Sequence, residues 1–119
     1  MREKSIAYQK AFDFSVEIVD LYKYLVKNKK EYVLSKQLLR SGTSIAGNIK
    51  EGIYGQSKSD FISKLSIALK EASETEYWIE LLVETDYLQQ EKGRDLTSDV
   101  VEIIKILTKS LKTAKKSRG

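Results

Sequence analysis

The chain has 119 residues, 41% of them hydrophobic, and a formal net charge of +4 from 21 basic and 17 acidic residues. This length suits a single domain built around one hydrophobic core, which we expect to span residues 1–119. Cysteine and histidine are both absent. Their absence excludes disulfides, thiol nucleophiles, Cys/His zinc sites and an imidazole base, so most enzyme mechanisms lose their central residue.

Targeting and membrane signals are also missing from the sequence. The N-terminal segment MREKSIAYQK has no apolar run, and no stretch approaches the length of about eighteen uncharged apolar residues that a membrane helix needs. We therefore expect a cytoplasmic protein without membrane association. Proline is absent too, and the abundance of Leu, Ile, Lys, Glu and Ala favours long helices, so the predicted class is all-α.

The first predicted helix covers AYQKAFDFSVEIVDLYKYLV, and the polar run at residues 27–31 ends it. Apolar side chains recur along this segment at spacings of three and four residues, as on one face of a helix. The stripe assigned to the core is Tyr8, Ala11, Phe12, Ser15, Val19, Tyr22 and Val26.

A second helix is predicted from about Tyr32 to Tyr54, and a third from a capping signature at Ser57 and Asp60 to about Tyr87. The fourth begins between Gln89 and Asp95. Short connections between amphipathic helices favour an antiparallel up-down four-helix bundle. The predicted core stripes are Leu34, Leu38, Ile45, Ile49 and Ile53; then Phe61, Leu65, Ala68, Ala72, Ile79 and Val83; then Leu96, Val100, Ile103, Ile104, Leu107 and Leu111.

The segment GTSIAGNI, residues 42–49, has two glycines spaced as in a phosphate-binding loop, but it does not meet the other requirements. Such a loop follows a strand and ends in Lys and Ser/Thr, whereas here a helical pattern precedes Asn48 and Ile49. The glycines are better explained as positions where another helix approaches closely.

A polar stripe of Ser41, Ser44, Asn48 and Glu51 runs beside the apolar stripe of the second helix. Glu76 lies within the core stripe of the third helix, and a buried carboxylate there needs hydrogen-bond partners. We predict a buried polar cluster of Ser41, Ser44, Asn48 and Glu76. The alternative is that Glu76 lies at the edge of the stripe and reaches water.

Two long segments, LLRSGTSIAGNIKEG and SKSDFISKLSIALKEASETEYWIELLVETDYL, carry a recognisable pattern. The chain resembles the bacterial four-helix bundle proteins known as large-subunit (23S) rRNA intervening-sequence proteins over nearly its whole length. The matching positions are Arg40, Ser44, Ile45, Asn48, Ile49, Glu51, Gly52, Phe61, Leu65, Ala68, Glu74, Glu76, Tyr87 and Leu88. Asp86 stands where glycine often precedes Tyr-Leu in the family.

The resemblance implies an antiparallel four-helix bundle that assembles as a ring, commonly a homopentamer. It also implies a relationship to the accessory proteins of diversity-generating retroelements, which bind nucleic acid and a reverse transcriptase. Possible partners are therefore RNA or DNA, a reverse transcriptase or another protein, and further copies of the chain.

The C-terminal segment KILTKSLKTAKKSRG contains six basic residues and no acidic residue. We predict phosphate contacts from this segment, whose tail begins near residue 112, and from a second basic patch on the second helix. The alternative is that these residues complement the dipole at a helix C-terminus and are otherwise solvated. The predicted nucleic-acid-binding residues are Lys109, Lys112, Lys115, Lys116 and Arg118, with Lys36, Arg40 and Lys50 as the second patch.

Apolar residues that lie outside the assigned core stripes predict an oligomer interface, because a monomer would expose them. The alternative is that they widen the core of the bundle itself. The predicted interface residues are Ile67, Trp78, Leu81 and Leu82 on the third helix, with Phe14, Ile18, Leu21 and Leu25 on the first.

Three classes of function can be compared on these observations. A weak, electrostatic nucleic-acid binder is favoured, and a protein-interaction scaffold is the alternative, since acidic residues crowd the second half of the third helix while the tail is basic. Catalysis is disfavoured because a di-iron site in a helical bundle needs Glu-x-x-His motifs and the chain has no histidine. No cofactor, metal or catalytic residue is predicted.

Overall fold

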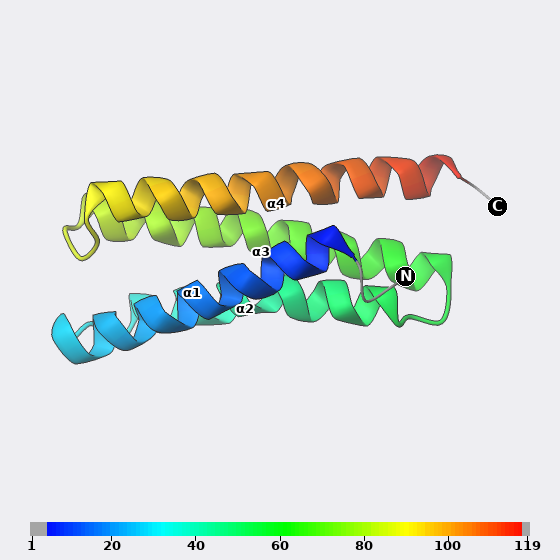
Figure 1. The fold of residues 1–119 in the computed structure, drawn as a ribbon. Helices are drawn as coiled ribbons and strands as arrows, with labels where there is room; N and C mark the ends of the chain where they lie inside the picture. The colour runs from blue at the N-terminus through cyan, green and yellow to red at the C-terminus, as the bar shows by residue number, and fades with distance from the viewer. Residues whose placement is uncertain (1–4, 118–119) are drawn as a thin grey trace.

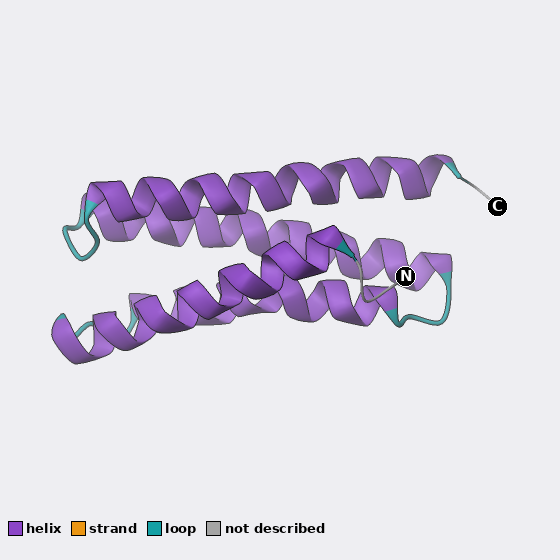
Figure 2. Cartoon of the chain, viewed as in Figure 1, coloured by secondary structure: helices purple, strands orange, loops and turns teal. Residues whose placement is uncertain are grey.

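The computed structural model describes residues 5–117, and in this range the chain forms four α-helices and no strand (Figures 1 and 2). The helices are α1 (Ile6–Asn28), α2 (Leu34–Ile53), α3 (Lys58–Glu84) and α4 (Gln90–Lys116). Successive helices run in opposite directions, so the α1–α2 and α3–α4 turns lie at one end of the molecule and the α2–α3 turn lies at the other (Figure 1). The predicted all-α four-helix bundle is confirmed.

The starts of α1, α2 and α3 are capped by side chains that accept hydrogen bonds from otherwise unpaired backbone N–H groups. Ser57 caps α3 by accepting from the Asp60 backbone N–H at 3.0 Å, as the sequence predicted. Ser5 caps α1 in the same way, accepting from the Tyr8 N–H at 3.1 Å.

The start of α2 is capped by Glu31, which the sequence pattern places in a polar linker. Its carboxylate accepts from the backbone N–H groups of Leu34 at 3.0 Å and Ser35 at 2.7 Å. Burial acts to raise the pKa of Glu31, but these backbone donors outweigh it and hold the pKa below its ordinary value. A buried glutamate, 8% exposed, thus anchors the α1–α2 turn.

The core runs the length of the bundle between all four helices. The predicted stripes of α2, α3 and α4 supply most of it. On α1 the predicted stripe is wrong apart from Ala11, which is fully buried: Phe12 is 48% exposed, whereas Phe14 is 2% exposed. Both sides of α1 are apolar, and the more uniformly aliphatic side faces inward. The buried α1 residues are Ala11, Phe14, Ile18, Leu21 and Leu25.

Glycines in α2 have different roles from one another. A Cβ on Gly42 would lie 2.9 Å from Cγ2 of Ile18, so glycine there lets α1 approach closely, as predicted. Gly47 is exposed, and a Cβ there would have no heavy atom within 4 Å, so close packing does not explain it.

Two helix ends differ from their predicted positions. Helix α3 stops at Glu84 rather than near Tyr87, because Asp86 has a left-handed backbone (φ 65°) and the N–H groups of Tyr87 and Leu88 turn back to the Leu82 carbonyl. Helix α4 continues to Lys116, so most of the predicted tail is helical. Within residues 5–117, no helix is both long enough and apolar enough to cross a membrane.

Candidate functional site

Helix α4 stops and α3 begins at the same end of the bundle (Figure 1), and these two segments carry exposed lysines. The Lys58 ammonium donates to the Ser117 hydroxyl at 3.3 Å, which joins these two helix ends. We call this set the lysine end, and it comprises Lys58, Lys109, Lys112, Lys115 and Lys116. Arg118, the last predicted phosphate contact, lies outside the described residues.

Carboxylates near the lysine end have other partners. Asp60 accepts from the Gln56 backbone N–H at 3.2 Å, and Glu51 forms an ion pair with Lys64 at 2.9 Å. Among the described residues, no ion pair involves the lysines of the lysine end. These ammonium groups are therefore available to an anionic partner.

The predicted second patch does not form as one surface. Lys36 and Lys50 are both exposed, but they lie fourteen residues apart on α2, about 21 Å along the helix. The Lys50 ammonium lies 5.8 Å from the centre of the Tyr8 ring. Arg40 lies between them and is held in ion pairs with α3, so it is not a free cation.

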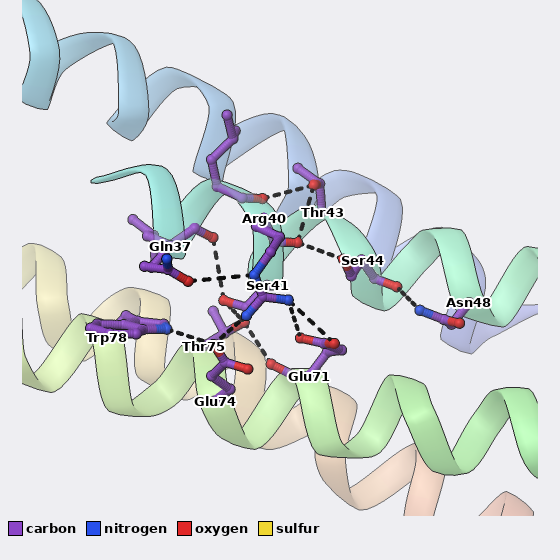
Figure 3. A network of polar contacts seen from close by, with 12 residues as sticks. Gln37, Arg40, Ser41, Thr43, Ser44, Asn48, Glu71, Glu74, Thr75 and Trp78 are labelled. Carbon is purple, nitrogen blue, oxygen red and sulfur yellow. Dashed lines mark hydrogen bonds and ion pairs between the residues drawn. The ribbon is translucent and has the colours of Figure 1, made fainter. Parts of the chain in front are cut away.

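Arg40 belongs to a polar network that joins α2 to α3 (Figure 3). Its guanidinium pairs with Glu71 at 3.1 Å and with Glu74, and the Trp78 indole N–H donates to Glu74 at 2.9 Å. The bonds from Trp78 and from Arg40 lower the pKa of Glu74. The pairing also raises the pKa of Arg40, chiefly through its bond to Glu74.

A buried pair of hydroxyls lies beneath this network (Figure 3). Thr75 and Ser41, both fully buried, are hydrogen-bonded at 2.9 Å, which gives α2 and α3 a polar contact inside the core. Thr75 is not among the residues predicted from the sequence. Its signal in the sequence is weak, because a helical threonine can bond the carbonyl four residues earlier, as Thr75 also does with Glu71 at 2.7 Å, and Glu76 beside it looks the more demanding residue.

The predicted buried cluster around Glu76 is therefore wrong. Glu76 is only partly buried and lines a hollow between α3 and α4, because one residue along a helix is a turn of about 100°. Ser44 donates to the Arg40 carbonyl at 2.6 Å, and the Asn48 amide donates to the Ser44 carbonyl at 2.9 Å, so both are satisfied within α2. Of these three α2 residues, Ser41 alone bonds across to α3 among the described residues, and its partner is Thr75 instead of the predicted Glu76.

The predicted interface residues divide into two groups. Phe14, Ile18 and Leu82 are at most 2% exposed, so they belong to the core of the bundle and cannot form a surface. Leu21 and Leu25 are buried with them. Ile67 is 38% exposed, and Trp78 and Leu81 are partly exposed. On α1, the apolar surface that remains is formed instead by Phe12 and Val16, which are about half exposed.

An acidic groove of 620 Å³ lies between α3 and α4, away from the lysine end. Glu76, Glu80 and Glu84 line it at four-residue spacing, with Ile79 and Val83 among the apolar lining and Arg94 on the α4 side. In residues 5–117, no three acidic side chains have an arrangement suited to holding a metal ion.

The fold and surface thus define an all-α four-helix bundle protein with exposed lysines gathered where α4 stops. A family model for 23S rRNA-intervening sequence proteins matches residues 3–109, and the chain belongs to this family. It is also similar to a protein of unknown function from the S23 ribosomal protein family of Bacteroides thetaiotaomicron VPI-5482. The two sequences are 52% identical, and the match covers 90% of this chain and 99% of the chain in that crystal structure. The two structures superimpose with a TM-score of 0.89. No curated protein matches the chain.

Proposed function

We propose that this chain is a non-enzymatic, oligomeric bundle protein that binds RNA or DNA weakly and electrostatically through its lysine end. The observation that carries the proposal is the clustering of Lys58, Lys109, Lys112, Lys115 and Lys116 where the neighbouring carboxylates are already engaged. Lysine ammonium groups bind phosphate as point charges, and such contacts supply affinity without reading sequence.

The family's name supports RNA as one partner, since it refers to an intervening sequence of 23S rRNA. A single copy with a net charge of +4 creates only a weak field. A ring, with a pentamer favoured, would repeat the lysine end around one axis and raise avidity without any strong single site. The exposed apolar side chains Phe12, Val16, Ile67 and Tyr77 support such self-association.

Charge-matched variants test the proposal. Replacing Lys109, Lys112, Lys115 and Lys116 together by glutamine removes four charges from the lysine end. The control replaces Lys23, Lys27, Lys29 and Lys30 by glutamine, which removes four exposed charges from the opposite half of the bundle. Binding to an RNA or DNA oligonucleotide is measured by fluorescence anisotropy at several salt concentrations.

We expect the first variant to weaken binding at least tenfold at about 50 mM salt and to flatten the salt dependence, by roughly 0.7–0.9 in log–log slope for each phosphate that the protein no longer neutralises. The control should keep most of the slope. If both variants behave alike, the lysine end is not the contact surface. If the unaltered protein binds no nucleic acid at about 50 mM salt, the proposed function fails.

A protein-interaction scaffold, for example an accessory subunit for a reverse transcriptase, is the second candidate. The acidic groove of Glu76, Glu80 and Glu84 favours it, because a basic segment of a partner would complement three carboxylates above an apolar floor. Replacing these glutamates by glutamine should weaken binding of a basic protein partner and leave nucleic-acid binding unchanged or stronger.

A further inference from the structure

A hollow of 450 Å³ lies within the lysine end, between the start of α3 and the last turns of α4. Its aromatic side is Phe61, which is partly buried against the core and also lines the hollow. The residues that line its other side are small or polar, and one of them is a lysine. They are Lys109, Ser110, Thr113, Ala114 and, just beyond the helix, Ser117.

The register of the helices explains why this part of α4 is open. Lys10, in the second turn of α1, pairs with Glu102 at 3.2 Å, and Glu17 pairs with Lys92 at 3.8 Å. Because α1 and α4 are antiparallel and α1 begins at Ile6, α4 continues about 15 Å beyond the start of α1. All residues that line the hollow come from the α3 and α4 segments.

We propose that this hollow binds an unpaired nucleobase of single-stranded RNA or DNA, with the base against Phe61 and the adjoining phosphates against Lys109, Lys112 and Lys58. This inference rests on the proposed function and narrows it to single strands. Stacking of a base on an aromatic side chain adds affinity with little sequence preference. Ser110 and Thr113 also line the hollow, and a hydroxyl group can donate to, or accept from, the polar edge of a base.

The chemistry of the lining favours a nucleotide over a purely apolar occupant. No carboxylate lines the hollow. Lys109 lines it, and the other lysines of the lysine end are exposed on the same two segments. An aromatic face, hydroxyl groups and ammonium groups match respectively the ring, the polar edge and the phosphate of one nucleotide. A double helix keeps its bases paired and stacked, so it cannot place one in the hollow without the free-energy cost of unstacking it.

Electrostatics alone predicts the opposite preference, which makes the inference testable. Each phosphate contact releases more counterion from a duplex than from a single strand, so lysines without a base site favour the duplex. Binding is therefore compared between a single-stranded 20-mer and the duplex of the same sequence. We expect the unaltered protein to bind the single strand more tightly at about 100 mM salt.

The decisive variant is Phe61→Leu, which keeps an apolar side chain but removes the ring. We expect it to weaken single-strand binding about fivefold or more and to change duplex binding less than about twofold. The matched control is Tyr32→Leu, which removes an exposed ring between α1 and α2, away from the lysine end, and should change neither affinity. Lys109→Gln should weaken both, because it removes a phosphate contact.

Photo-crosslinking of the unaltered protein to a single strand containing 5-bromouridine gives a measurement that does not depend on how the variants fold. We expect the adduct on the tryptic peptide of residues 59–64, which contains Phe61. Duplex binding as tight as single-strand binding, with Phe61→Leu inert and adducts elsewhere, would overturn the base site and leave the proposed function standing. Failure of the protein to bind either form at about 50 mM salt would overturn both. A change in oligomer mass caused by Phe61→Leu, without loss of affinity for the single strand, would assign the hollow to subunit contact instead.

Discussion

The α2–α3 seam and the α1–α4 seam lie on opposite sides of the bundle, and they differ in how their carboxylates are paired. Across α2–α3, Arg40 lies between Glu71 and Glu74, and Trp78 donates to the same Glu74. Across α1–α4, two lysines pair with Glu102 and Glu17. Asp99 lies close to other carboxylates at this seam, and no ion pair among the described residues involves it.

The two seams shift carboxylate pKa values in opposite directions. Hydrogen bonds from Trp78 and Arg40 lower the pKa of Glu74, whereas burial, reinforced by the charges of Glu102 and Asp95, raises the pKa of Asp99. Helical periodicity puts charged residues on the rim of both seams. Whether opposite charges meet there depends on the register between helices, which periodicity does not encode.

These shifts have opposite consequences for stability. Glu74 has a lowered pKa in the folded state, so its contribution is complete above its unfolded pKa and is lost as the pH falls through the folded value. Asp99 has a raised folded pKa, so its charged form is unfavourable at neutral pH and that cost is relieved as the pH falls through the folded value.

The largest expected effect tests whether the less well paired α1–α4 seam is nevertheless tightly packed. Phe14 is 2% exposed and lies beneath Asp13, Glu17 and Asp99 at this seam. Phe14→Ala should cost about 3–5 kcal/mol of unfolding free energy, measured by urea denaturation, because it leaves a cavity in the core. Phe12→Ala, on the exposed side of α1, is the control and should cost less than about 1 kcal/mol. Similar values for the two variants would mean that α1 does not face the core as described.

A smaller effect is expected where the α2–α3 seam is broken. Arg40→Gln should lower stability by about 1 kcal/mol at pH 7, a modest value because the arginine side chain is 47% exposed and solvent screens the pair. The loss should shrink as the pH falls through the lowered pKa of Glu74, because the carboxylate then becomes protonated and the ion pair is lost. Lys92→Gln, at the 3.8 Å pair of the α1–α4 seam, should cost less. A loss for Arg40→Gln that does not change with pH would show that the ion pairs are not its cause.

The smallest expected effect is a gain in stability, whereas the two variants above lose stability. Asp99→Asn removes a charge that the α1–α4 seam disfavours, so it should raise stability by about 0.5 kcal/mol at pH 7. This advantage should disappear as the pH falls and Asp99 of the unaltered protein takes up a proton. Thermal unfolding of both proteins between pH 7 and pH 4 checks the trend. Destabilisation at pH 7 would mean that Asp99 makes a favourable contact and that the two seams are alike.

Local patterns in the sequence predicted the class of the fold, the approximate limits of four helices, the Ser57 cap and most of the inward faces of α2, α3 and α4. Each of these follows from local chemistry, such as the spacing of apolar residues or a hydroxyl one turn before an unpaired N–H. The basic character of the α4 C-terminus was also predicted from the sequence, because this segment contains several lysines and no acidic residue.

Four features depend on how the helices pack together. They are the buried side of α1, the bond of Ser41 to Thr75 instead of Glu76, the ion pairs of Arg40 with α3, and the position of Phe61 beside Lys109 of α4. Helix α1 is apolar on two sides, so periodicity alone could not choose between them. The other three depend on the rotation and axial register of one helix against another, where about 100° or a few ångströms exchanges one neighbour for the next. Those two quantities arise from packing the whole core at once, because no single helix carries them.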